Sequence, residues 1–151
     1  MIKNLLFILF YLPFGLIAQE KEIKSSNYFD DLTLEEIEII VKKGTERAWS
    51  GIYLSNTDKG MYVCKACYNP LFNSDSKFIS ICGWPSFDDE IDKAIIRKQD
   101  YSLGMKRIEI CCSNCEGHLG HIFEGEGLTD KNIRHCVNSL SILFIPKKIT
   151  E

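Results

Sequence analysis

The fold is decided by the stretch Arg134-His135-Cys136-Val137-Asn138-Ser139, which opens an apolar strand that continues to residue 145. Successive side chains of a strand point to opposite faces, so this segment combines a polar start and an apolar remainder on one face. That face carries Arg134, Cys136, Asn138, Leu140, Ile142 and Phe144. We predict one strand over residues 137–145, anchored by its apolar half, that presents Cys136 and Asn138 at the edge of a buried sheet.

Cys136 is the candidate nucleophile of this segment. A thiolate attacks and a thiol does not, so a reactive cysteine needs neighbouring charge or donors that lower its pKa below the free value of about 8.5. Arg134 and His135 could supply that positive charge. The alternatives are a structural cysteine that packs as a small hydrophobe and, for Arg134, a surface salt bridge.

The rest of the chain predicts a mainly β domain with one short helix. Thr33 and Glu36 form a capping box that begins the helix, and Gly44 ends it. Beyond Gly44 the apolar residues come in short runs separated by Gly, Asn, Asp and Pro, which is typical of antiparallel strands. The clearest runs cover residues 61–63, 77–81, 107–111 and 137–145.

Length and charge restrict the class of protein. A chain of 151 residues has the length of one domain. Hydrophobic residues make up 45% of it, which suffices for a core without stabilising disulfides. The formal net charge of −3 argues against a nucleic-acid partner.

The amino-terminal segment has the pattern of a secretory signal peptide over residues 1–18. Lys3 precedes an apolar run that ends at Ala18 and is shorter than the roughly 20 residues that span a bilayer. We therefore expect a periplasmic or secreted protein with no stable membrane insertion after cleavage. A flexible lead-in should cover residues 19–31 and the domain residues 32–148. An uncleaved membrane anchor is the alternative.

Two Cys-x-x-Cys pairs indicate a metal site. Cys64 and Cys67 form one pair, Cys112 and Cys115 the other, and each pair puts two sulfurs on a tight turn. Two such zinc-knuckle halves complete a four-thiolate tetrahedron, so we predict one structural Zn²⁺ that clamps two distant hairpins together. Disulfides are the alternative in an exported protein. Cys111 should point to the opposite face from Cys112 and is left out of the shell.

Two histidines, His118 and His121, are left free for proton transfer because four thiolates fill the tetrahedron. All three histidines lie between residues 118 and 135, which favours one shared polar site. An offset of three puts His118 and His121 on opposite faces of a plain strand, so Gly117 or Gly120 must turn the chain if both act together. Their alternative is a histidine-rich metal site or hydrogen-bonded surface groups.

Several segments together resemble the methionine sulfoxide reductase B family, peptide-methionine (R)-S-oxide reductases, over residues 33–147. The segments are Thr45-Glu46-Arg47, Gly60-Met61-Tyr62-Val63-Cys64, Pro70-Leu71-Phe72, Lys77-Phe78, Gly83-Trp84-Pro85-Ser86-Phe87, His118-Leu119-Gly120-His121 and Arg134-His135-Cys136-Val137-Asn138-Ser139. The resemblance implies two antiparallel sheets in a β-tent, Mss4-like fold, one structural zinc ion, and reduction of the R epimer of methionine sulfoxide in oxidised proteins.

The resemblance also implies roles for individual residues. Cys136 would attack the sulfoxide and become a sulfenic acid, and Cys82, where many members carry a resolving thiol, would close a disulfide with it. A thioredoxin-like reductant would then open that disulfide. The remaining roles are proton donation by His118, His121 and Asn138, a cradle for the methyl group at Trp84, and support of the thiolate by Arg134.

The chain departs from the family pattern at three positions. His135 stands where tyrosine is more frequent, Trp49 replaces a phenylalanine, and Ile81 takes a glycine position, which could restrict closure of the Cys82 disulfide. Three rival functions remain open at this point: a zinc-knuckle binding module without catalysis, a thiol-disulfide oxidoreductase acting on other proteins, and a peroxide-reducing thiol enzyme.

Overall fold

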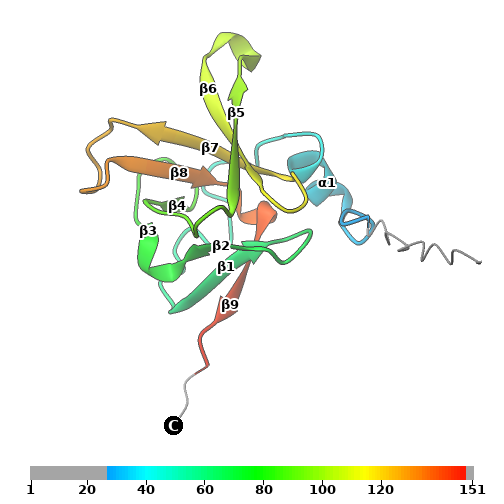
Figure 1. The fold of residues 1–151 in the computed structure, drawn as a ribbon, viewed down its shortest axis with the longest axis horizontal. Coiled ribbons are helices and arrows are strands. Elements are labelled where there is room, and N and C mark those ends of the chain that lie inside the picture. Colours follow the sequence, from blue (N-terminus) through cyan, green and yellow to red (C-terminus); the bar gives the residue numbers. More distant parts are fainter. Residues whose placement is uncertain (1–26, 149–151) are drawn as a thin grey trace, which may run out of the picture.

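Two antiparallel sheets form the framework of the computed structural model, which describes residues 27–148 (Figure 1). The smaller sheet has the strand order β2 (Pro70–Asn73), β1 (Gly60–Cys64), β9 (Ile142–Pro146). The larger has the order β3 (Lys77–Phe78), β4 (Ser86–Phe87), β8 (Ile133–Val137), β7 (His118–Glu124), β6 (Arg107–Cys112), β5 (Ile95–Asp100). The predicted mainly β architecture is confirmed.

The predicted signal peptide over residues 1–18 lies outside the described residues, as does most of the lead-in over residues 19–31. Within residues 27–148, no helix has both the length and the apolar character needed to cross a membrane.

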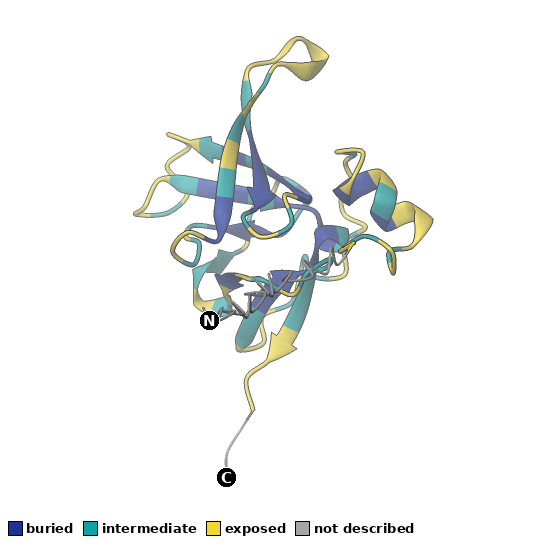
Figure 2. Ribbon diagram, turned by 45° about the vertical axis from the view of Figure 1, so that its right-hand side comes forward, coloured by how far each residue is buried: buried dark blue, intermediate teal, exposed yellow. Residues whose placement is uncertain are grey.

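The core forms where the two sheets meet, and aromatic side chains from both of them fill it. Phe72 of β2 stacks on Phe87 of β4 with ring centroids 4.3 Å apart, and Tyr62 of β1 meets Phe87 edge-on at 5.0 Å. All three rings are fully buried. Figure 2 shows the buried residues gathered at this junction, while the tip of the β5–β6 hairpin is exposed.

The predicted helix is α1 (Leu34–Ile40), and its capping box is present. The Thr33 hydroxyl accepts from the Glu36 N–H, and the Glu36 carboxylate accepts from the Thr33 N–H. The helix ends at Ile40, before Gly44, and buries Glu36, Ile39 and Ile40. It covers the chain near the turn after β8, so it packs and contributes no group to the pocket described below.

The prediction of one strand over residues 137–145 is wrong. The chain leaves the larger sheet at the end of β8, passes through a short 3₁₀ helix at Ser139–Ser141, and enters the smaller sheet as β9. The turn is held from outside, because the carboxylate of Glu46 accepts hydrogen bonds from the N–H groups of Ser139 and Leu140. The side chains of β8 that face the core are those of His135 and Val137. Those of Arg134 and Cys136 lie on the opposite face.

The predicted strand over residues 77–81 is shorter than expected and ends at Phe78. Ile79 and Ile81 are exposed, so the apolar pattern of this segment does not mark a buried strand. The residues that follow β3 instead form the loop that carries Cys82.

A bulge in β7 allows His118 and His121, which are three residues apart, to lie side by side. Cys111 pairs with His118 and Ile110 with Gly120, so Leu119 has no partner in the register. Gly120 has φ +154°, and a Cβ there would lie 1.9 Å from the carbonyl oxygen of Cys136. Only glycine fits this close approach of β7 to β8. The bulge brings the rings of His118 and His121 to a centroid distance of 5.5 Å, as the sequence required for joint action.

Candidate active site and metal centre

A pocket of about 120 Å³ opens over β7 and β8 next to Cys136. It is lined by Thr45, Trp84, Arg107, Gly120, His121, Phe123, Cys136, Val137 and Asn138. Four residues selected from the sequence, Trp84, His121, Cys136 and Asn138, therefore line one pocket, whereas Cys82, His118 and Arg134 are not among its lining residues. A larger hollow of about 680 Å³ lies over β1 and β9, but none of its lining residues is a cysteine or histidine.

The side chains of Cys82 and Cys136 face each other across the loop that follows β3. Their sulfurs are 3.8 Å apart, a hydrogen-bond contact rather than the roughly 2.05 Å of a disulfide. Ser80 Oγ lies 2.9 Å and Ser86 Oγ 3.5 Å from the sulfur of Cys82. The two sulfurs are therefore in contact but not bonded.

The hydrogen bond between the two thiols favours negative charge on Cys82 over Cys136. The hydrogen bond from the Cys136 thiol, supported by Ser80 and Ser86, lowers the pKa of Cys82 to about 4 although burial opposes this. The same hydrogen bond and burial raise the pKa of Cys136, and the charge of Arg134 offsets only part of the rise. The two thiols share one proton, so the expectation that Cys136 attacks as the thiolate stays a prediction.

Alkylation at mildly acidic pH is expected to modify Cys82 before Cys136. At about pH 5 a thiol with a lowered pKa is largely thiolate, and only the thiolate reacts with iodoacetamide. Peptide mass spectrometry after a brief exposure measures the order of labelling. Cys136→Ala serves as the control, since loss of the donating thiol should slow labelling of Cys82. Modification of Cys136 first would contradict this assignment of charge.

Arg134 and His135 point to opposite sides of β8, so only one of them acts on Cys136. Nε and Nη2 of Arg134 donate to Glu126 at 2.7 and 2.8 Å, and its guanidinium lies 4.4 Å from the ring centroid of Phe123. Arg134 thus forms the salt bridge, and its charge also offsets part of the rise in the pKa of Cys136. His135 is buried, donates from Nδ1 to the carbonyl of Phe87 and contacts a carboxylate, so it supports packing rather than the thiolate.

Each of the other two histidines contacts a carboxylate of the β5–β6 hairpin. His121 Nε2 lies 2.8 Å from Asp100 Oδ2, and His118 Nδ1 lies 2.8 Å from Glu109 Oε1. His121 lines the pocket. His118 is 2% exposed, its Nε2 has no hydrogen-bond partner among the described residues, and burial lowers its pKa.

The sequence prediction missed both carboxylates. Asp100 and Glu109 reach the histidines through strand register and the bulge in β7, which a single sequence does not display. Glu109 also accepts from Lys43 at 2.8 Å, so it is a buried hub that fixes the ring of His118. The two carboxylates hold the orientation of both rings beside the pocket.

Trp84 and Asn138 are fixed in the pocket wall by hydrogen bonds to backbone groups. The indole Nε1 of Trp84 donates to the carbonyl of Glu46 at 3.1 Å. The Asn138 side chain donates to the carbonyl of Leu119 at 3.2 Å and accepts from the N–H of Glu46 at 3.1 Å. One N–H of the Asn138 amide stays available for a bound group, which limits this side chain to a single further donation.

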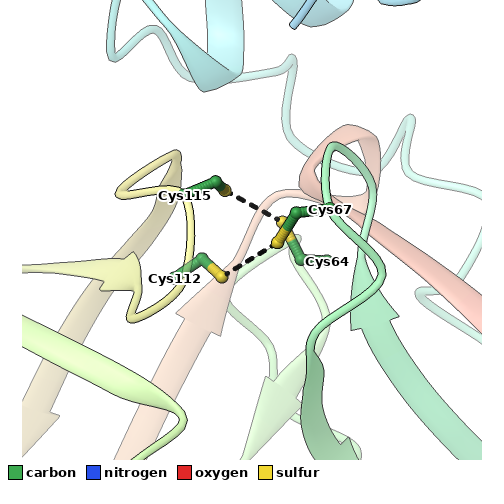
Figure 3. Close-up of side chains that lie close together, drawn as sticks. All are labelled: Cys64, Cys67, Cys112 and Cys115. Atoms are coloured by element: carbon green, nitrogen blue, oxygen red, sulfur yellow. Dashed lines mark hydrogen bonds between the residues drawn. The ribbon is translucent and has the colours of Figure 1, made fainter. Parts of the chain in front are cut away.

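The four cysteines of the two Cys-x-x-Cys pairs converge on one point, as predicted (Figure 3). The sulfurs of Cys64 and Cys115 are 3.6 Å apart and those of Cys67 and Cys112 3.5 Å, close to the about 3.8 Å that separates ligands of a tetrahedral zinc–thiolate centre. These distances exclude disulfides in this state. Cys111 lies outside the group, next to Glu109 and His118, as expected.

The chemistry of this cluster also fits a cation. Hydrogen bonds with the sulfurs of Cys112 and Cys115, together with burial, raise the pKa of Cys64 strongly. A positive charge between the sulfurs would offset this opposition to the thiolate form of Cys64, and the cluster could hold one metal ion.

These features define a thiol-dependent oxidoreductase: a pair of facing cysteines beside a pocket with an aromatic wall and a histidine, on an antiparallel fold with a separate four-cysteine centre. The chain belongs to the SelR domain family, whose model matches residues 32–146. The family resemblance predicted from the motifs is thereby confirmed.

Curated relatives of this chain carry the names of sulfoxide reductases. It is 44% identical over 131 residues to "Peptide methionine sulfoxide reductase MsrB" of Teredinibacter turnerae, covering 85% of this chain and 96% of the relative. The protein of that name from Leptospira interrogans is 48% identical over 115 residues, covering 76% and 87%. Human "Methionine-R-sulfoxide reductase B2, mitochondrial" is 42% identical over 142 residues, covering 89% and 78%. Among solved structures, the Mis18 "Yippee-like" domain covers 61% of this chain with a TM-score of 0.48 and 15% identity.

Proposed function

We propose that this protein reduces the R epimer of methionine sulfoxide to methionine, with Cys136 as the attacking sulfur. The observation that carries the proposal is the position of Cys136 in the pocket wall with the sulfur of Cys82 3.8 Å away. Membership in the SelR domain family supports the same reaction. Loss of sulfoxide reduction in a folded Cys136→Ser variant tests the proposal.

The pocket has the two kinds of surface that a methyl sulfoxide needs. The methyl and alkyl groups require an apolar cradle, which Trp84 and Phe123 provide. The sulfoxide oxygen requires donors where negative charge develops, and His121 and the free N–H of Asn138 lie on that wall. The small volume fits the end of one side chain rather than a whole peptide, so an oxidised methionine of a protein would enter from the open side.

The chemical steps balance within the two cysteines. Cys136 attacks the sulfoxide sulfur while its proton passes toward the Cys82 thiolate, and His121 supplies a proton to the oxygen. The oxygen ends on Cys136 as a sulfenic acid, which oxidises that sulfur by two electrons, and the thioether leaves reduced by two. Cys82 then attacks the sulfenic sulfur, and the departing hydroxide takes a proton and leaves as water. A dithiol reductant opens the resulting disulfide.

Replacement of the histidines is expected to slow turnover to different extents. His121 lines the pocket, so His121→Ala should lower the rate by about 10²–10⁴-fold, the usual worth of a positioned acid or base. His118→Ala should cost less, because this ring stands behind His121. Steady-state reduction of an R-sulfoxide peptide measures both rates.

The matched control is the third histidine, on the other side of β8. His135→Tyr, which introduces the residue that the family more often carries, should retain most of the activity. If His121→Ala reduced the sulfoxide at the parental rate, the assignment of the proton donor would be wrong.

Cys82→Ser is expected to complete one turnover and then stop when a thioredoxin-like dithiol is the reductant. Without the second sulfur no intramolecular disulfide can form, so the sulfenic acid persists on Cys136. Mass spectrometry would detect the added oxygen, and a burst of one methionine per enzyme would precede the stall. Sustained cycling with the dithiol protein would exclude the resolving role of Cys82.

The same proposal extends to the metal, the partners and the location. One structural Zn²⁺ would be held by Cys64, Cys67, Cys112 and Cys115, since four thiolates in tetrahedral arrangement are its preferred protein ligands. The signal-peptide pattern of residues 1–18 supports export, in which case a thioredoxin-like reductant outside the cytosol must deliver electrons. The catalytic domain would then begin after the lead-in at residue 32.

A further inference from the structure

We propose that Glu46 is the positioning residue of the active-site pocket, because one residue holds Trp84, Asn138 and the turn after β8 in a fixed relation. The inference rests on the proposed binding of the sulfoxide in this pocket. Glu46 does not line the pocket itself, so it would act only through the residues that do.

The side chain of Glu46 anchors its segment to the end of the catalytic strand. It is 7% exposed, and its two carboxylate oxygens accept from the N–H groups of Ser139 at 2.7 Å and Leu140 at 3.1 Å. These N–H groups begin the 3₁₀ helix and would otherwise be unpaired, so the carboxylate acts as its cap. Burial raises the pKa of Glu46, and the two backbone donors oppose that rise.

The backbone of Glu46 then reaches the two pocket side chains. Its N–H donates to Asn138 Oδ1 at 3.1 Å, and its carbonyl accepts from Trp84 Nε1 at 3.1 Å. The orientation of the amide and of the indole therefore depends on where this one peptide lies. The carboxylate determines that position, since it joins the segment to Ser139, the residue that follows Asn138.

The carboxylate of Glu46 is tightly packed against the chain at Gly51. A Cβ added at Gly51 would lie 2.2 Å from Ser139 Oγ and 2.8 Å from Glu46 Oε1, so the chain is packed directly against the carboxylate and its partner. Thr45, the preceding residue, is part of the pocket wall. A displacement of Glu46 must consequently move the pocket residues rather than be absorbed by a loose loop.

Replacement of the carboxylate should change substrate handling rather than only stability. Misplacement of reacting groups by about 1 Å can cost a factor of about 10², so Glu46→Ala should lower kcat/KM by about tenfold to a hundredfold. KM should rise together with the fall in kcat, because Trp84 contacts the substrate before reaction. Glu46→Gln keeps one acceptor oxygen for the turn and should restore part of the loss.

The matched control is Glu36→Ala. Glu36 is also 7% exposed, its carboxylate accepts from Thr33 and pairs with Lys65, and it has no place in the pocket. Its loss should lower the melting temperature while KM stays unchanged. Both variants are assayed well below their melting temperatures with an R-sulfoxide peptide.

A spectroscopic readout tests the geometry without substrate. In a Trp49→Phe background Trp84 is the only tryptophan, so acrylamide quenching of its fluorescence reports its exposure directly. Glu46→Ala should increase quenching of Trp84, and Glu36→Ala should not.

These experiments distinguish failure of the positioning role from failure of the proposed function. Equal kinetics and equal quenching in the two alanine variants would overturn the positioning role, and so would a change in quenching with kcat/KM at the parental value. Failure of the proposed function would appear elsewhere, as a parental protein that does not reduce the sulfoxide at all.

Discussion

Cys136→Ser is expected to abolish reduction of methionine R-sulfoxide. A serine hydroxyl does not ionise near neutral pH and cannot carry the transferred oxygen as a sulfenic acid, so the first step has no substitute pathway. Removal of the nucleophile in other enzymes costs on the order of 10⁶-fold in kcat, which places the variant below detection. Release of methionine from an R-sulfoxide peptide measures the effect.

The structure explains why this variant should still fold. Cys136 lies on the pocket side of β8, whereas the core side of that strand carries His135 and Val137. Exchange of sulfur for oxygen leaves no cavity in the core, so the melting temperature should remain close to that of the parent. Parental turnover by a folded Cys136→Ser protein would remove the basis of the proposed reaction.

Loss of the metal is expected to unfold the protein. Structural zinc contributes about 10–16 kcal/mol of binding free energy in zinc-finger peptides, a figure as large as the about 5–15 kcal/mol that holds a whole domain together. Cys64→Ser removes a proposed zinc ligand that is buried at the end of β1, so the variant should lose the proposed metal and its cooperative melting transition. Elemental analysis and thermal unfolding measure both, with one zinc ion per chain in the parent.

Cys111→Ser is the matched control for the zinc prediction. Cys111 precedes a ligand directly in sequence and is equally buried, but its sulfur belongs to the group around Glu109. This variant should retain one zinc ion. Retention of zinc and of an unchanged melting temperature by Cys64→Ser would instead show that the four cysteines do not form a structural metal centre.

The parts of the structure that the sequence predicted are those set by local chemistry or by motif. Thr33 and Glu36 act on each other across three residues, so the capping box is readable without a fold. Each Cys-x-x-Cys pair is likewise a property of one turn, and two half-sites need each other to be complete. Cys82 and Cys136 were brought together by the family resemblance, and the structure places their sulfurs in contact.

The parts that the sequence did not predict depend on partners distant in the chain. Polar and apolar residues on alternate positions of residues 134–144 suggest one strand. Glu46 nevertheless caps the 3₁₀ turn in the middle of this segment, where the chain passes into the other sheet. His135 is adjacent to Cys136 but on the opposite face, so proximity in sequence suggested a role that its contact with Phe87 excludes. Asp100 reaches His121 only through the pairing of three strands.

The crossing from β8 to β9 makes the two sheets dependent on one continuous segment of the chain. The peptide that bears Cys136 and the strand that pairs with β1, where Cys64 lies, are one short uninterrupted segment. Neither sheet can be exchanged as a module by recombination without cutting that segment.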